Sequence, residues 1–248
     1  MNCFPTRSNF YMMNKINIFK QLRLRIVSLI YPRVCAACGK ALLEGEQTVC
    51  TKCAYTFPKT GYEMNKDNPL AQVFYGRIDF YAVTACFFFS KKGKVQHVIH
   101  QLKYKGNAEA GLFLGREMGK ILNESPLFND ADYIFPVPLH PKKERKRGYN
   151  QSELIARGAA EVMKAKVDKS HLVRTVNTAT QTKKSREERW LNVKDIFDVQ
   201  NKDDLKGKHV LIIDDVITTG ATLEACGRAL ADIEGIRISV ATVACAGN

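Results

Sequence analysis

The stretch HVLIIDDVITTGATL, residues 209–223, decides the fold class. Its apolar part, 209–213, predicts a strand that is buried on both faces of a parallel sheet. Asp214 and Asp215 are then expected at the carboxyl end of this strand, the edge at which open α/β sheets bind ligands. A turn rich in threonine follows, and it leads into a helix predicted over 220–232.

This turn has the chemistry of a phosphate site. A helix N-terminus offers unpaired N–H groups and the positive end of its dipole to an anion. Thr218, Thr219 and Thr222 add hydroxyl donors, and Gly220 lets the backbone approach a phosphate closely. The two carboxylates preceding the turn can accept hydrogen bonds from a sugar diol. The stretch therefore predicts a ribose 5-phosphate site, and the alternative, a helix cap with solvated acids, requires only one acid.

Strands and helices are predicted to alternate along the rest of the chain, which favours a mostly parallel sheet with helices on both faces. The further strands are expected at 78–90, 133–137 and 236–243. The further helices are expected at 16–30, 95–104, 108–122 and 152–165. A basic stretch without apolar periodicity, 175–189, is expected to be a mobile loop.

Composition divides the chain into three parts. Residues 1–13 are expected to form a loose extension, 14–60 a helix with a cysteine-bearing module, and 78–248 an α/β domain. The helix at 16–30 is amphipathic and basic, so it either docks on the core or lies on a membrane surface. A connection rich in Pro, Asn and Gly, 58–76, makes a natural boundary.

The chain carries 38 Lys and Arg against 25 Asp and Glu, a formal net charge of +13. This balance favours phosphate-bearing partners, but it does not separate nucleic acid from a small phosphorylated ligand. The longest apolar run, 82–89, is far shorter than the roughly 20 residues that span a bilayer. With no transmembrane segment and no signal cleavage site, we expect a cytoplasmic protein.

Two CxxC pairs, Cys35 with Cys38 and Cys50 with Cys53, lie eleven residues apart. Each pair presents two thiolates from one tight turn, and two such pairs complete a tetrahedral zinc site. A disulfide or redox role is the alternative, although a cytoplasmic chain keeps its thiols reduced. Four ligands leave no open position, so the predicted zinc is structural.

The segment VLIIDDVITTGAT, 210–222, resembles the phosphoribosyl pyrophosphate (PRPP) signature of type I phosphoribosyltransferases. LKYKGN at 102–107, PVPLHPKKERKRGYNQSELIA at 136–156, TATQTKKSREERWLNV at 178–193 and the double CxxC resemble the ComF family, which is linked to DNA uptake and DNA utilisation. The resemblance implies a type I phosphoribosyltransferase-like sheet with an N-terminal zinc-ribbon-like module, and PRPP bound with Mg²⁺. The implied PRPP contacts are Asp214, Asp215, Val216, Thr218, Thr219, Gly220, Ala221 and Thr222.

The resemblance also places a pyrophosphate turn after the strand at 133–137 and a flexible hood at 175–189. The residues implied for pyrophosphate and basic contacts are Pro138, Leu139, His140, Lys142, Lys143, Arg147, Lys183 and Arg189. The basic block 142–147 is equally well interpreted as a solvated face.

Two classes of function fit these residues. The first is an enzyme that transfers the phosphoribosyl group, for which the sequence names no catalytic base and no acceptor. The second is a PRPP-sensing or single-stranded-DNA-binding protein of the DNA-uptake machinery, with the basic block and Tyr104 or Tyr149 as contacts. Glutamine amidotransfer needs a cysteine nucleophile at a processed N-terminus. Cys3 is not in that position, so we reject this activity.

Overall fold

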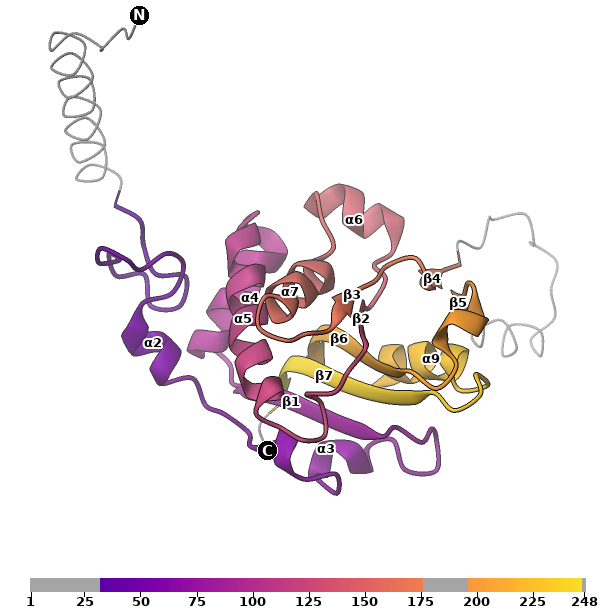
Figure 1. Ribbon diagram of the computed structural model, residues 1–248. Coiled ribbons are helices and arrows are strands. Elements are labelled where there is room, and N and C mark those ends of the chain that lie inside the picture. The colour runs from indigo at the N-terminus through magenta and orange to yellow at the C-terminus, as the bar shows by residue number, and fades with distance from the viewer. Residues whose placement is uncertain (1–31, 176–195, 247–248) are drawn as a thin grey trace, which may run out of the picture.

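The computed structural model describes residues 32–175 and 196–246 (Figure 1). The predicted extension 1–13 and the predicted helix 16–30 lie outside these residues. Most of the predicted hood, including Lys183 and Arg189, also lies outside them. The part of the chain that the structure describes contains no helix long and apolar enough to cross a membrane.

Five parallel strands form the central sheet in the order β1-β7-β6-β2-β3. Their bounds are β1 Ala82–Phe89, β2 Tyr133–Pro136, β3 Lys166–Val167, β6 His209–Ile217 and β7 Arg237–Ala246. Two short antiparallel strands, β4 Leu172–Arg174 and β5 Phe197–Val199, flank the predicted hood. The predicted α/β class with a mostly parallel sheet is confirmed.

Helices cover both faces of the sheet (Figure 1). One face packs against α4 Lys94–Tyr104, α5 Ala108–Asn123 and α7 Gln151–Ala160. The other face packs against α3 Pro69–Gln72 and α9 Ala221–Leu230. Helices α5 and α7 lie in backbone contact, since a Cβ added at Gly115 would stand 2.0 Å from the Ile155 carbonyl oxygen.

The apolar strands explain the two layers. In β6, Leu211 and Ile213 are buried on the α5 side, while Val210 and Ile212 are buried on the α9 side. This alternation with apolar residues on both faces is typical of a parallel strand inside an α/β domain. Because the strands are parallel, their carboxyl ends lie on one edge of the sheet. Strands β2 and β6 lead into turns at this edge.

Several predicted boundaries differ from the structure. The strand predicted from residue 78 begins at Ala82, and the helix predicted to 165 ends at Ala160. The basic block, for which we predicted no helix, forms α6 Pro141–Arg147. Pro141 begins this helix with its fixed φ, and Gly148 ends it in the left-handed region at φ 83°.

The connection 58–76 contains two short helices, η1 Tyr62–Met64 and α3, and packs on β1. Asn68 fixes it there: its side-chain amide donates to the carbonyls of Tyr62, Asn65 and Val83, at 3.3, 2.8 and 2.9 Å. Its Oδ1 accepts from the first backbone N–H groups of α3. One buried side chain thus holds this segment against the sheet.

Candidate functional site

The two acids lie inside β6, because this strand runs to Ile217 and not to 213 as predicted. Strand β2 stops pairing at Pro136, opposite Ile213, whereas β7 continues beside β6 as far as Cys245. The continued pairing with β7 keeps the backbone extended past the acids. Beyond Ile213 the β2 side of β6 is open, so the acids still lie at the carboxyl edge of the sheet.

Asp214 is fixed by short contacts at the start of α7. Its Oδ1 accepts a hydrogen bond from Ser152 Oγ at 2.7 Å and from the Asp215 backbone N–H at 2.8 Å. Burial and the neighbouring Asp215 carboxylate raise the pKa of Asp214 to about 7, although these two hydrogen bonds act in the opposite direction. Its protonation state therefore changes near neutral pH, a property common at functional sites.

Asp215 pairs with a residue for which the sequence predicted no role. Lys103 Nζ on α4 lies 2.9 Å from Asp215 Oδ1, and the Asp215 side chain is only 6% exposed. The other carboxylate oxygen, Oδ2, is buried and has no hydrogen-bond partner among the described residues. A buried oxygen of this kind costs free energy unless a ligand satisfies it. The acid pair thus offers oxygen ligands of the type that Mg²⁺ or a sugar hydroxyl would take.

The predicted phosphate turn has the expected geometry. Gly220 is the N-cap of α9 with a φ of 75°, and a Cβ there would stand 2.8 Å from the ring of Phe74. Glycine is thus required by both conformation and packing. Val216 is half-buried just before the turn, and the turn itself is open to solvent. The exposed members of the turn are Thr218, Thr219, Ala221 and Thr222.

Glu224 lies in the first turn of α9, where its negative charge would repel a phosphate, but two arginines neutralise this charge. Glu224 forms ion pairs with Arg77 and with Arg228, and the pKa of Glu224 lies below its usual value because these arginines outweigh its burial. Arg77 also donates to the Thr219 carbonyl at 3.4 Å, so it fixes the turn. Sequence reasoning missed Arg77, which lies far from the motif along the chain.

The predicted pyrophosphate turn lies beside the acids. The Val137 N–H donates to the Ile213 carbonyl at 2.9 Å, and half-buried Pro138, Leu139 and His140 follow. His140 is the N-cap of α6, since its Nδ1 accepts from the Lys142 N–H at 3.1 Å. The two turns implied by the sequence are therefore adjacent at one sheet edge.

The basic block is a solvated helix with one ordered end. Lys142 and Lys143 are exposed on α6, whereas half-buried Arg147 donates to Gln151 Oε1 at 2.5 Å. The Arg147 guanidinium lies 5.8 Å from the ring centroid of Tyr104, which is 65% exposed. The Arg147 end of α6 therefore lies next to an exposed aromatic ring, that of Tyr104 at the end of α4.

Tyr149 does not offer the stacking surface that the sequence suggested. Its ring is half-buried against the core, and its hydroxyl donates to the Leu102 carbonyl at 2.5 Å. Of the two aromatics that we considered, Tyr104 has the more exposed ring, although the His100 ring lies against it at a centroid distance of 4.9 Å. The distinction depends on tertiary packing, which the local sequence does not show.

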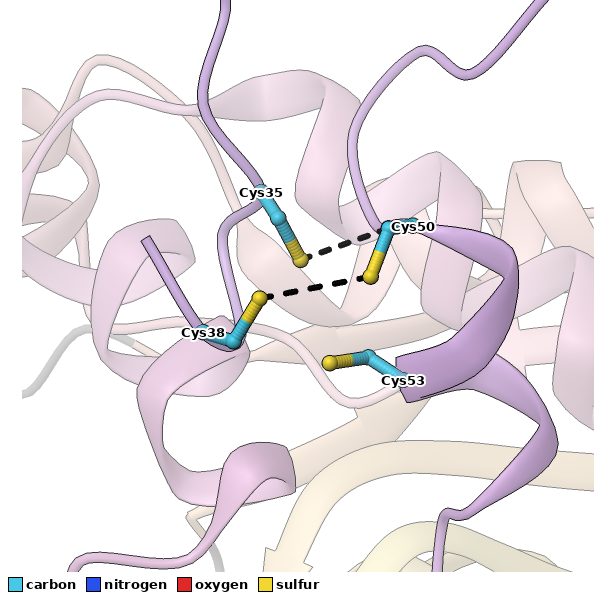
Figure 2. A group of neighbouring side chains, drawn as sticks. All are labelled: Cys35, Cys38, Cys50 and Cys53. Carbon is cyan, nitrogen blue, oxygen red and sulfur yellow. Dashed lines mark hydrogen bonds between the residues drawn. The ribbon is translucent and has the colours of Figure 1, made fainter. Parts of the chain in front are cut away.

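The four predicted zinc ligands come together in the N-terminal module (Figure 2). The Sγ atoms of Cys35, Cys38, Cys50 and Cys53 all lie within 4.8 Å of one another. Cys38 Sγ and Cys50 Sγ are 4.0 Å apart, close to the roughly 3.8 Å expected between two ligands of a tetrahedral zinc with 2.3 Å bonds. The group could hold a metal ion, and all seven cysteines in the described residues are free thiols.

The thiols of this group have unequal acidities. Burial opposes ionisation of Cys35, but backbone N–H groups from Cys50, Cys38 and Ala37 lower its pKa to about 7. Burial and the neighbouring thiols raise the pKa of Cys53 to about 12. Four crowded thiols cannot all ionise without a cation among them, so the donor set fits a metal such as zinc.

The cysteine module shares the core of the α/β domain. Phe57, just after α2 Thr51–Tyr55, packs edge-on against Phe87 of β1 and Phe113 of α5, with ring centroids 5.3 and 6.4 Å away. His97 Nδ1 lies 3.0 Å from the Ala37 carbonyl oxygen, between the two CxxC cysteines. The four-cysteine group is therefore coupled to the neighbouring helix α4.

Residues 152–248 match the family model described as a phosphoribosyl transferase domain. The match contains the acid pair, the phosphate turn and Ser152. The carboxyl-terminal part of the chain is thus similar to phosphoribosyl transferase domains.

Three curated relatives to which the chain is similar are named as DNA utilization or competence proteins. The DNA utilization protein YhgH of Escherichia coli O6:H1 is 33% identical over 129 residues, 51% of this chain and 56% of its own. Competence protein ComFC of Bacillus subtilis is 29% identical over 137 residues, 55% of this chain and 53% of its own. Competence protein F of Haemophilus influenzae is 33% identical over 98 residues, 39% of this chain and 43% of its own.

The chain spans about half the length of the curated relatives that it matches. Together with the domain match and the four-cysteine group, these similarities confirm the resemblance to the ComF family that the sequence motifs indicated.

Proposed function

We propose that the protein binds PRPP together with Mg²⁺ at the carboxyl edge of its sheet, in a cytoplasmic role linked to DNA uptake or DNA utilisation. The observation that carries this proposal is the acid pair beside a glycine-capped helix N-terminus. Asp214 and Asp215 would accept the ribose hydroxyls, and the turn 218–222 would hold the 5-phosphate. The turn 137–140 would face the pyrophosphate.

A Mg²⁺ ion bound at this site would neutralise part of the negative charge of the pyrophosphate. The unpartnered Oδ2 of Asp215, with the Asp214 carboxyl group next to it in β6, fits such an ion. In a transfer reaction, the chain's own part would be to position the sugar and to stabilise developing charge. Among the described residues we assign no catalytic base, and the chemistry of transfer remains part of the proposal.

The zinc proposal is separate from the PRPP proposal. We assign the ion held by Cys35, Cys38, Cys50 and Cys53 as structural zinc, because four Sγ atoms within 4.8 Å of one another supply all four ligands and leave no open position for a reactant.

Single-stranded DNA binding is the second candidate function. One specific observation favours it: exposed Tyr104 lies against Arg147, at the end of a helix whose other lysines and arginine face solvent. Bases stack on exposed aromatic rings while cations follow the phosphates. The names of the relatives, a DNA utilization protein and competence proteins, support this direction.

Calorimetry on paired variants tests the principal proposal. The double variant Asp214→Asn and Asp215→Asn keeps the shape of the acid pair but removes its charge, and we expect it to lose binding of Mg²⁺·PRPP. Asp203→Asn is the matched control, since Asp203 is an exposed acid whose ion-pair partner among the described residues is Lys206. Unchanged PRPP affinity in the double variant would mean that the acids are a structural cap.

A further inference from the structure

The ion pair between Lys103 and Asp215 is incomplete on both sides. An ammonium group has three donors, but within 32–175 and 196–246 the Nζ of Lys103 pairs with Asp215 Oδ1 alone. The other oxygen of this carboxylate, Oδ2, is buried and has no hydrogen-bond partner among the same residues. A pair that only stabilises the fold needs further hydrogen bonds on both groups to offset their loss of hydration. This pair instead leaves the acid ready for another ligand.

A divalent ion and the Lys103 ammonium would be close neighbours on this acid. An ion bound at Oδ2 lies beside the ammonium at Oδ1, because both oxygens belong to one carboxylate. Two positive charges at such a separation repel strongly when little water lies between them, and the Asp215 side chain is only 6% exposed. Asp215 therefore favours one cation at a time.

The backbone around Lys103 is held in place, so the side chain can leave Asp215 without it. The Leu102 carbonyl accepts a hydrogen bond from the Tyr149 hydroxyl. The Gln101 carbonyl accepts from the Lys105 N–H at 3.0 Å, which closes the end of α4. The Lys103 side chain is 22% exposed and has a flexible four-carbon stem. Its ammonium group can therefore turn into solvent while the helix keeps its position.

We propose that Lys103 occupies the place of Mg²⁺ at Asp215 in the free protein and competes with the ion for this carboxylate. The inference rests on the proposed function, since the ion is the one expected with PRPP. Lys103 then does more than neutralise an acid: it keeps the acid pair closed to Mg²⁺ until a ligand supplies further negative charge. The pyrophosphate of PRPP supplies that charge, so the ion and PRPP should bind together.

Binding of Mn²⁺ to the purified protein in the absence of PRPP tests this competition. Mn²⁺ prefers the same oxygen ligands as Mg²⁺, and electron paramagnetic resonance measures its free concentration. Lys103→Met and Lys103→Gln both remove the charge, and the glutamine keeps a group that can donate to Asp215 and support the fold. Lys103→Arg keeps the charge, and Lys105→Met is the matched control at a more exposed lysine.

We expect the two neutral variants to bind Mn²⁺ at least about tenfold more tightly than the wild type and Lys105→Met do. Lys103→Arg should bind the ion as weakly as the wild type, because its guanidinium still pairs with Asp215. Addition of Asp215→Asn to Lys103→Met should remove the gain in affinity. That loss would locate the bound ion at the acid from which the lysine was removed.

Three results would overturn the role of Lys103: equal Mn²⁺ affinity in the wild type and both neutral variants, a gain in Lys103→Arg as large as in Lys103→Met, or a gain in Lys103→Met that survives Asp215→Asn. The two proposals fail separately. A gain in the neutral variants without PRPP binding to the wild type would contradict the proposed function, whereas PRPP binding without that gain would contradict only the competition.

Discussion

Lys103 Nζ on α4 lies 2.9 Å from Asp215 Oδ1 on β6 and pairs with an acid that is almost fully enclosed. The pair helps two neighbouring carboxyl groups to coexist at the end of β6. Lys103 balances the charge of Asp215, while Ser152 donates to Asp214. Helices α4 and α7 thus prepare the end of β6 for a ligand.

Removing this lysine should weaken the fold. In Lys103→Met the aliphatic stem remains but Asp215 loses its cation, so we expect the free energy of unfolding to fall by about 1–2 kcal/mol, less than for a fully buried pair because Lys103 is partly exposed. Urea unfolding at pH 7.5 measures this change in the free energy of unfolding. Lys105→Met, at an exposed lysine two residues further along, is the control. Equal stability of both variants would show that the ion pair contributes nothing.

PRPP binding should strengthen as the pH rises through neutrality. Asp214 has a pKa of about 7 in the free protein, and only its ionised form accepts hydrogen bonds on both oxygens. Binding should therefore select the ionised form and release a proton below pH 7. Calorimetry between pH 6 and 8 in buffers of different ionisation enthalpy measures this release.

Asp214→Asn is the control for that experiment, since the ionisation of PRPP itself persists in it. A wild-type pH profile identical to that of Asp214→Asn would contradict the role of the acid. The same raised pKa also affects stability. Between about pH 4 and 7 folded Asp214 keeps a proton that the unfolded chain has lost, so this group's contribution to stability declines as the pH rises.

The cysteine module should contain about one zinc per chain. In Cys38→Ser the site loses one thiolate, and we expect loss of the metal and of the packing of Phe57 on β1. Elemental analysis of the purified protein and proteolysis within 32–57 measure the two effects. Cys86→Ala changes a buried cysteine outside the group and should keep its zinc. Metal-free wild-type protein with a protease-resistant module would contradict the assignment.

If α6 binds single-stranded DNA, affinity should fall steeply with salt, because each neutralised phosphate releases about 0.7 counterion. Charge reversal at Lys142, Lys143 and Arg145 should flatten the slope, and Tyr104→Ala should weaken binding at every salt concentration. Tyr149→Phe, which keeps the half-buried ring, should leave DNA affinity unchanged. Fluorescence anisotropy with a labelled oligonucleotide measures these effects. No binding at low salt would exclude this function.

PRPP and DNA should also compete, because α6 directly follows the turn 137–140. A titration of PRPP against the bound oligonucleotide should displace it. Independent binding would place DNA elsewhere on the molecule.

Much of the site could be predicted from the sequence, because its parts are local. The acid pair, the glycine at a positive φ and the four cysteines each lie within a short motif whose spacing sets their geometry. The parallel sheet followed from the alternation of apolar strands with helices. These features depend on the backbone and on neighbouring residues.

The remaining features depend on contacts between distant segments. Strand β6 extends past 213 only because β7 pairs with it, and Lys103 reaches Asp215 only because the fold brings the end of α4 close to the carboxyl end of β6. Tyr104 and Tyr149 look alike in the sequence, yet tertiary packing exposes the first and half-buries the second. The motif LKYKGN, which contains Lys103, was the one local signal that could have identified this lysine.

The most direct test of the central claim is a calorimetric titration of PRPP into the wild-type protein, with Mg²⁺ and without it, beside a titration of ribose 5-phosphate. We expect one PRPP to bind per chain, Mg²⁺ to strengthen its binding, and ribose 5-phosphate to bind more weakly with little dependence on Mg²⁺. The absence of PRPP binding in the presence of Mg²⁺ would contradict the proposed PRPP site, as would equal affinity for PRPP and ribose 5-phosphate.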